Sequence, residues 1–178
     1  MFRLAKIVTK ITEVAHWVGA ALMAAAAGCC AFAPQWLGYF VGIDLTEDKM
    51  ELSIYGWGVT VAVSDGNIDK TTFCLFALGA VIVFVLMALV FRNLYLIIKK
   101  SEGVTPFQAE NVCRLERMGA FAISIPMVSV CLGILLSGLR PLEVHSSGDS
   151  FLMGILVLCL TQVFARGVEL EKEVDGLL

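Results

Sequence analysis

Hydrophobic and polar positions divide the chain into four long apolar runs separated by polar segments. The runs cover about residues 14–32, 73–98, 118–139 and 151–166, and 58% of the 178 residues are hydrophobic. About 20 consecutive apolar residues let an α-helix cross the hydrocarbon core of a bilayer, whereas a soluble domain averages about 45–50% apolar residues. The pattern predicts an all-α integral membrane protein: four transmembrane helices in one domain, packed as a four-helix bundle.

The fourth run is short unless its helix continues through Arg166, whose long side chain can snorkel toward the membrane surface. Gln162 is then expected to hydrogen-bond to another helix. Residues 167–178 continue with an apolar stripe at helical spacing and charged residues on the other faces, which predicts an amphipathic segment outside the bilayer. The stripe begins at Val163, before this segment, and continues with Gly167, Leu170, Val174 and Leu177.

The polar stretch 33–72 connects the first two runs. Within it, residues 50–63 alternate partly between apolar and polar positions, and Tyr55-Gly56 lies where the alternation pauses. This pattern predicts a small β-hairpin, which is too small to bury a core of its own and must rest on the helices or the membrane surface.

Lysines and arginines are distributed unevenly among the polar segments. Ten of the thirteen lie before the first run, from Arg92 to Arg117, or from Arg166 onward, against Lys49, Lys70 and Arg140 elsewhere. Because basic residues stay on the cytoplasmic side of a membrane, both termini and segment 99–117 are predicted to be cytoplasmic and the hairpin extracytoplasmic.

Segment 99–117 carries the start signals of a helix. Thr105 is in the position of an N-cap, Pro106 follows at the first helical position, and Gln108 completes a capping box. The helix is predicted to run from there into the third span, where Pro126 predicts a kink.

The first run is poor in large side chains. Ala20, Ala24 and Gly28 recur every four residues, which predicts a bare helix face that packs inside the bundle or against a second copy. Glu13 and His16 stand one turn apart at the inner end of this run. They are either a proton-sensing pair or polar residues at the level of the lipid headgroups.

The two polar segments on the predicted cytoplasmic side are expected to form one surface that docks a soluble partner. In this hypothesis Phe107, Leu115 and Met118 pack against Leu170 and Val174. Arg114 and Arg117 oppose Glu169 and Glu173, which forms an electrostatic clamp between the inner ends of the third and fourth spans. The residues assigned to docking are Phe107, Glu110, Asn111, Arg114, Arg117, Arg166, Glu169, Glu171 and Glu173. The residues assigned to helix packing are Ala20, Ala24, Gly28, Gln162 and Gly167.

Two motifs in these segments resemble a bacterial family of small four-span membrane proteins that is known only as a domain of unknown function. They read P-F-x-x-E-N-x-x-R-L at residues 106–115 and V-F-x-R-G-x-x-L-x-x-[DE] at residues 163–173. The resemblance covers mainly the second half of the chain. It implies a bacterial inner-membrane protein encoded beside a short Cro-like helix-turn-helix regulator, and it implies no catalytic residue.

Enzyme chemistry finds little support in the sequence, which contains no phosphate-binding glycine loop, no H-E-x-x-H, no nucleophile elbow and no C-x-x-C. The six cysteines lie mostly in apolar runs and are interpreted as buried small hydrophobes. We therefore predict a non-enzymatic regulatory or sensory protein without metal or cofactor and without direct contact to nucleic acid. The alternative is a channel, transporter or efflux subunit for small molecules, acting as a homo-oligomer.

Overall fold

The computed structural model describes residues 2–32, 49–55, 57–64, 67–103, 105–139, 144–146 and 149–175. Its described part contains four helices that are long and apolar enough to span a membrane. This confirms the four predicted helices. They are α1 (Phe2–Phe32), α3 (Lys70–Lys100), α4 (Ala109–Leu139) and α5 (Asp149–Asp175).

The helices are longer than the apolar runs that predicted them. Three contain 31 residues and α5 contains 27, which at 1.5 Å per residue gives lengths of about 46 and 40 Å. A hydrocarbon core is about 30 Å thick, so helices of these lengths exceed it by about 10–16 Å. As predicted, α5 continues through Arg166, whereas α1 begins at Phe2 instead of near residue 14.

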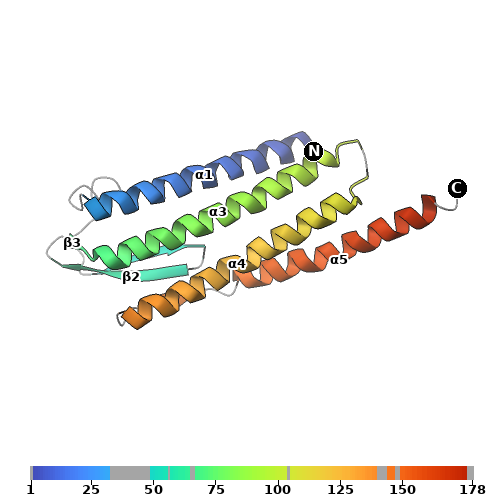
Figure 1. Cartoon of the computed structure of the whole chain (residues 1–178). Helices are drawn as coiled ribbons and strands as arrows, with labels where there is room; N and C mark the ends of the chain where they lie inside the picture. Colours follow the sequence, from blue (N-terminus) through green and yellow to red (C-terminus); the bar gives the residue numbers. More distant parts are fainter. Residues whose placement is uncertain are drawn as a thin grey trace.

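The four helices lie side by side with alternating directions (Figure 1). At one end α1 begins, α3 ends, α4 begins and α5 ends, and we call this the terminal end. There Lys6 of α1 forms an ion pair of 2.6 Å with Glu102, after α3. Thr105, before α4, donates a 3.3 Å hydrogen bond to Glu171 of α5. The opposite end carries the β-strands, and we call it the sheet end.

Glycines allow α4 and α5 to approach closely. A Cβ on Gly154 would lie 2.6 Å from the Ile123 side chain and 3.1 Å from its backbone nitrogen, and a Cβ on Gly119 would clash with Leu158. These two contacts also fix the register. They place the start of α5 beside the middle of α4, so that the last turns of α4 extend beyond α5 (Figure 1).

The sheet contains the predicted hairpin. Strands β1 (Lys49–Ile54) and β2 (Trp57–Ser64) pair antiparallel, with Ile54 opposite Trp57 across the turn. Strand β3 (Asn67–Ile68) pairs with the end of β2. Strand β4 (Val144–Ser146), which the pattern of apolar and polar positions did not indicate, also pairs with β2.

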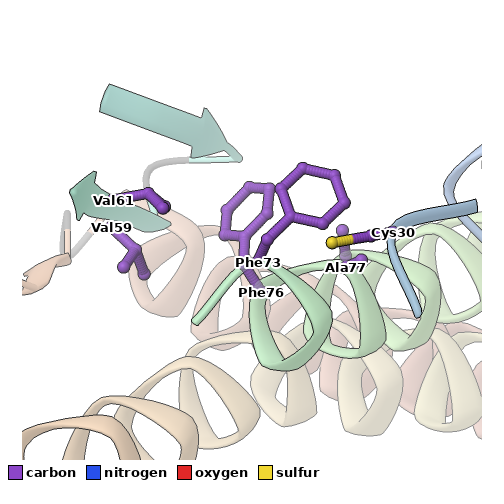
Figure 2. Packing of buried hydrophobic residues seen from close by; sticks show 7 residues of the cluster. Cys30, Val59, Val61, Phe73, Phe76 and Ala77 are labelled. Atoms are coloured by element: carbon purple, nitrogen blue, oxygen red, sulfur yellow. The ribbon is translucent and has the colours of Figure 1, made fainter. Parts of the chain in front are cut away.

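A hydrophobic cluster joins the sheet to the helices at the sheet end (Figure 2). Val59 and Val61 are fully buried, because residues two apart on a strand share a face. They lie near Phe73 and Phe76 of α3, and Cys30 of α1 belongs to the same cluster. Leu132, in the part of α4 beyond α5, packs against this cluster as well. The sheet thus covers the end of the helix bundle that lies beyond the start of α5.

A second cluster lies toward the terminal end and contains Ile97, Leu115 and Met118. In the second half of α5, Phe164 packs against this cluster. Leu170 and Val174 are 57% and 58% exposed, so the predicted packing of these two residues is wrong. Both residues lie nearer the C-terminal end of α5 than the part of the helix that contacts this cluster.

The predicted start of α4 is also wrong, because the helix begins at Ala109. The carbonyl of Pro106 accepts hydrogen bonds from the Gln108 backbone and from the Asn111 side chain, both at 3.0 Å. A helix starting at Pro106 would need that carbonyl for the backbone nitrogen of Glu110. A side chain that competes for a backbone acceptor in this way delays the helix by a turn.

The predicted bare face of α1 packs only in part. Ala20 is buried, but Ala24 is exposed, and a Cβ on Gly28 would meet nothing within 4 Å. Gln162 is exposed and donates no hydrogen bond to another described residue, contrary to expectation. The six cysteines are free thiols, but Cys113, Cys131 and Cys159 are exposed, so the predicted burial is wrong for these three. Predictions for residues 33–48 and for Leu177 lie outside the described residues.

Candidate functional site

The residues assigned to docking do not form one continuous surface. Asn111 is fully buried. Its side-chain nitrogen donates hydrogen bonds to the Ser101 hydroxyl, at 3.3 Å, and to the Pro106 carbonyl. It therefore holds the connection between α3 and α4 in place and is not available to a partner, so its predicted docking role is wrong. The ring of Phe107 lies 5.4 Å from that of Phe164 and occupies the space that a side chain on Gly167 would need.

The charged residues of the two segments pair mostly within their own element. Glu110 binds Arg114 at 2.6 Å, one turn along α4, and also Lys100 of α3. Arg166 pairs at 3.4 Å with Glu169 on α5. No ion pair joins the arginines of α4 to the acidic residues of α5 among the described residues. The expected electrostatic clamp between the two helices is therefore absent from this part of the chain.

The end of α5 presents the most accessible of the predicted docking residues. Glu169 and Glu173 are exposed one turn apart, and Leu170 and Val174 are exposed beside them. We call these four residues the tail surface. Figure 1 shows that α5 projects past the connection between α3 and α4, so this surface is clear of the other helices. Glu171 faces back toward that connection, since it accepts the hydrogen bond from Thr105.

A hydrogen-bonded polar pair, which the sequence pattern did not reveal, joins α1 to the hairpin turn, where Tyr55 is 41% exposed. His16 of α1 is 7% exposed, and its Nε2 atom forms a short hydrogen bond with the hydroxyl of Tyr55 at the hairpin turn. Its Nδ1 atom forms a hydrogen bond of 2.6 Å with the backbone carbonyl of Thr12. Because a carbonyl can only accept, Nδ1 carries the hydrogen, and in the neutral imidazole Nε2 accepts from Tyr55.

Aromatic rings surround this pair. The His16 ring lies 5.2 Å from that of Phe91 and 6.0 Å from that of Phe84, both on α3. His16 lies at mid-length of α1, where it packs against α3.

Glu13 is also buried, at 5% exposure, and is separate from this pair. Its carboxylate forms a 2.8 Å ion pair with Lys10, whose ammonium group lies 5.3 Å from the centre of the Tyr95 ring. The structure thus gives Glu13 and His16 different partners. The expected pairing of these two residues with each other is not what the geometry shows.

Tyr55 has a left-handed backbone with a φ of 49°. A bulky side chain rarely adopts this conformation, and such strain persists only where the surroundings determine it. The hydrogen bond to His16 and the edge contact with Phe84, at 6.3 Å between ring centres, hold the side chain in this position. The hairpin is thereby attached to the helices at its turn.

An apolar cavity of about 430 Å³ adjoins Tyr55. Tyr55 contributes the one polar side chain among its described lining residues, and helices α3, α4 and α5 supply the rest. This volume is within the range of small-molecule sites, about 300–1,000 Å³. The apolar lining residues are Met87, Val90, Phe91, Leu94, Met118, Ala122, Ile125, Met153 and Val157.

The hydropathy pattern could not predict the contact between His16 and Tyr55, because the two residues are 39 positions apart in the sequence and lie on different elements. A tyrosine at the turn of a hairpin, where glycine and asparagine are usual, was the available signal. Within the described residues, no group of three or more His, Cys, Asp or Glu side chains is placed to hold a metal ion.

Comparisons of the chain with protein-family models, with curated proteins and with solved structures find no match.

Proposed function

We propose that the chain is a non-enzymatic regulatory protein of the bacterial cytoplasmic membrane that binds a soluble partner through the tail surface. The observation that carries this proposal is the exposure of Leu170 and Val174 on a helix that projects from the bundle. Exposed apolar side chains flanked by charges on a rigid helix are a common form of protein-binding surface.

The proposed orientation places both termini in the cytoplasm. The terminal end of the bundle carries most of the lysines and arginines, including Lys6, Lys100 and Arg114. The positive-inside rule supports a cytoplasmic location for that end and an extracytoplasmic location for the sheet.

The charge of the tail supports a basic partner. Residues 169–175 contain four acidic residues and one lysine, which gives a net charge of −3. A small DNA-binding regulator is a partner of suitable charge, and it is the partner that the family resemblance implies. A regulator bound here would be kept at the membrane and away from its operator.

The hairpin would supply the sensory element of this mechanism. Tyr55 connects the sheet to His16 in the middle of the bundle, so a ligand or partner that moves the sheet would disturb contacts among α1, α3 and the apolar cavity. The helices α3, α4 and α5 that line this cavity continue to the terminal end.

Co-purification with a helix-turn-helix regulator encoded beside the gene tests the proposal. The double substitution Leu170→Ser and Val174→Ser should abolish capture, and the charge reversal Glu169→Lys with Glu173→Lys should weaken it strongly. Glu171 is left unchanged because it bonds Thr105.

Glu116→Lys is the matched control, because Glu116 is an exposed acidic residue of α4 outside the tail surface. It should capture the regulator like the wild type. Equal capture by all variants, or none by the wild type, would contradict the proposed function.

Labelling of single cysteines in intact cells tests the orientation. A cysteine at residue 48 or 147 should react with a membrane-impermeant reagent, whereas one at Glu102 or Glu173 should react only after the membrane is opened. The opposite pattern would reverse the proposed orientation.

The apolar cavity beside Tyr55 favours a second candidate function, in which the chain binds and moves a small lipophilic molecule as an oligomer. Exposed Ala24 on α1 leaves a bare face for a second copy. Solute flux in liposomes that contain only this protein would support this function over partner docking.

A further inference from the structure

A groove of about 490 Å³ lies between α3 and α4 near the terminal end. Its polar part is basic, with guanidinium groups from both helices and one acidic residue. The rest of its lining is apolar. The polar lining residues are Arg92, Asn93, Glu110, Arg114 and Arg117, and the others are Leu89, Leu96, Cys113 and Phe121.

Positive charge in this groove exceeds the negative charge. Glu110 is the one carboxylate of the lining, and it already binds both Arg114 and Lys100. Arg92 and Arg117 are exposed and form no hydrogen bond or ion pair with another described residue. Guanidinium groups that share a groove repel each other unless an anion lies between them.

Arg114 has unused hydrogen-bonding capacity within the protein. Its Nη2 atom donates to Glu110, but its Nε atom is buried and has no partner among the described residues. The arginine side chain itself is 19% exposed. A guanidinium group has five donors in a planar fork that matches the oxygens of a phosphate, and a buried donor without a partner is costly.

The position of the groove along the helices identifies the kind of anion. Arg92 precedes the end of α3 at Lys100 by eight residues, or about 12 Å. At this depth a side chain lies near the boundary between headgroups and acyl chains when the helix ends project from the bilayer. The apolar lining residues Leu89 and Phe121 border the same groove, so an amphiphile fits it better than a free anion.

We propose that this groove binds an anionic phospholipid, whose phosphate lies between Arg92, Arg114 and Arg117. Its acyl chains then lie along Leu89, Leu96 and Phe121. The phosphate offsets the repulsion between the arginines and joins α3 to α4 at the terminal end. This inference does not depend on the partner proposed above, because it rests on α3 and α4 and not on the tail surface.

Native mass spectrometry of the purified protein tests the inference. The protein is reconstituted with phosphatidylglycerol or phosphatidylcholine, transferred to detergent and examined for retained lipid. Wild-type protein should retain phosphatidylglycerol in preference to phosphatidylcholine. The double variant Arg92→Gln, Arg117→Gln should retain about tenfold less phosphatidylglycerol, since each basic residue near a membrane surface contributes measurably to anionic lipid binding.

The matched control for each single substitution, Arg92→Gln or Arg117→Gln, is Arg166→Gln, which removes one positive charge from the same end of the bundle but from outside the groove. It should retain lipid like the wild type. An equal loss in Arg166→Gln would mean that general surface charge attracts the lipid, and absence of retained phosphatidylglycerol in the wild type would also overturn the inference. Each single substitution, Arg92→Gln or Arg117→Gln, provides the test where the double variant does not fold.

Inorganic phosphate distinguishes the lipid from a free anion. At millimolar concentration it should neither displace phosphatidylglycerol nor raise the unfolding temperature of the protein in phosphatidylcholine. Displacement or stabilisation by phosphate alone would identify the groove as a site for small anions and would contradict the lipid assignment.

Discussion

Removal of the Tyr55 hydroxyl should destabilise the protein although the aromatic ring remains. In Tyr55→Phe the ring can keep its contacts with His16 and Phe84, at 5.8 and 6.3 Å between ring centres. What is lost is the hydrogen bond to Nε2 of His16. That nitrogen belongs to a residue that is 7% exposed, and its other ring nitrogen is already bonded to Thr12.

The magnitude follows from this geometry. A buried acceptor left without a partner costs about 1–3 kcal/mol. For a chain of this length, 1 kcal/mol shifts the unfolding temperature by about 2–4 °C, so a loss of about 2–12 °C is expected. The measurement is thermal unfolding in detergent, followed by circular dichroism. Tyr95→Phe is the matched control, because the Tyr95 hydroxyl has no described hydrogen bond, and it should unfold like the wild type.

The double variant His16→Leu, Tyr55→Phe completes the test. Replacing both partners of a hydrogen bond by apolar groups of similar size can be nearly neutral. The double variant should therefore be less destabilised than the sum of the two single variants. Additive effects, or a Tyr55→Phe protein as stable as the wild type, would mean that the hydrogen bond contributes nothing.

Three further predictions concern helix packing. Gly154→Ala should destabilise the protein by about 1–3 kcal/mol in chemical unfolding, because the new methyl group meets backbone of α4 at 3.1 Å; Gly28→Ala, with open space around it, is the control and should be at least as stable as the wild type, because alanine favours a helix more than glycine does. Ala24→Leu should leave the unfolding of the monomer unchanged, since Ala24 is exposed; a loss of stability would mean that α1 packs there. Cys30 and Cys74 are adjacent, so copper phenanthroline should join them in an intramolecular disulfide, detectable by non-reducing peptide mapping; failure to form it would argue against the register of α1 and α3.

The four helices and the hairpin could be predicted because each depends on a local pattern. Apolar runs of membrane length specify the helices without regard to their neighbours, and the alternation around Val59 and Val61 specifies a strand with one buried face. The continuation of α5 past Arg166 followed from the spacing of its apolar stripe. Each of these features can be read from a window of about 10–20 residues.

The features that were missed depend on contacts between distant segments. Strand β4 has three residues and is recognisable only by its pairing with β2. Helix α4 starts late because the Asn111 side chain donates a hydrogen bond to the carbonyl of Pro106. The capping signals at Thr105 do not reveal this competition for the carbonyl. Spacing alone also could not show which side of α1 faces α3, and so Ala24 was assigned to the packed face.

The contact between His16 and Tyr55 attaches the hairpin to a bundle of four long apolar helices. Polar groups in an apolar surrounding must satisfy each other. The histidine offers an acceptor at mid-length of α1, and the tyrosine hydroxyl supplies the donor at the hairpin turn. The strained backbone of Tyr55 is tolerated because this bond and the nearby rings determine its position. Since α5 begins only beside the middle of α4, the sheet occupies the space left at that end, and the hydrogen bond fixes its depth against α1.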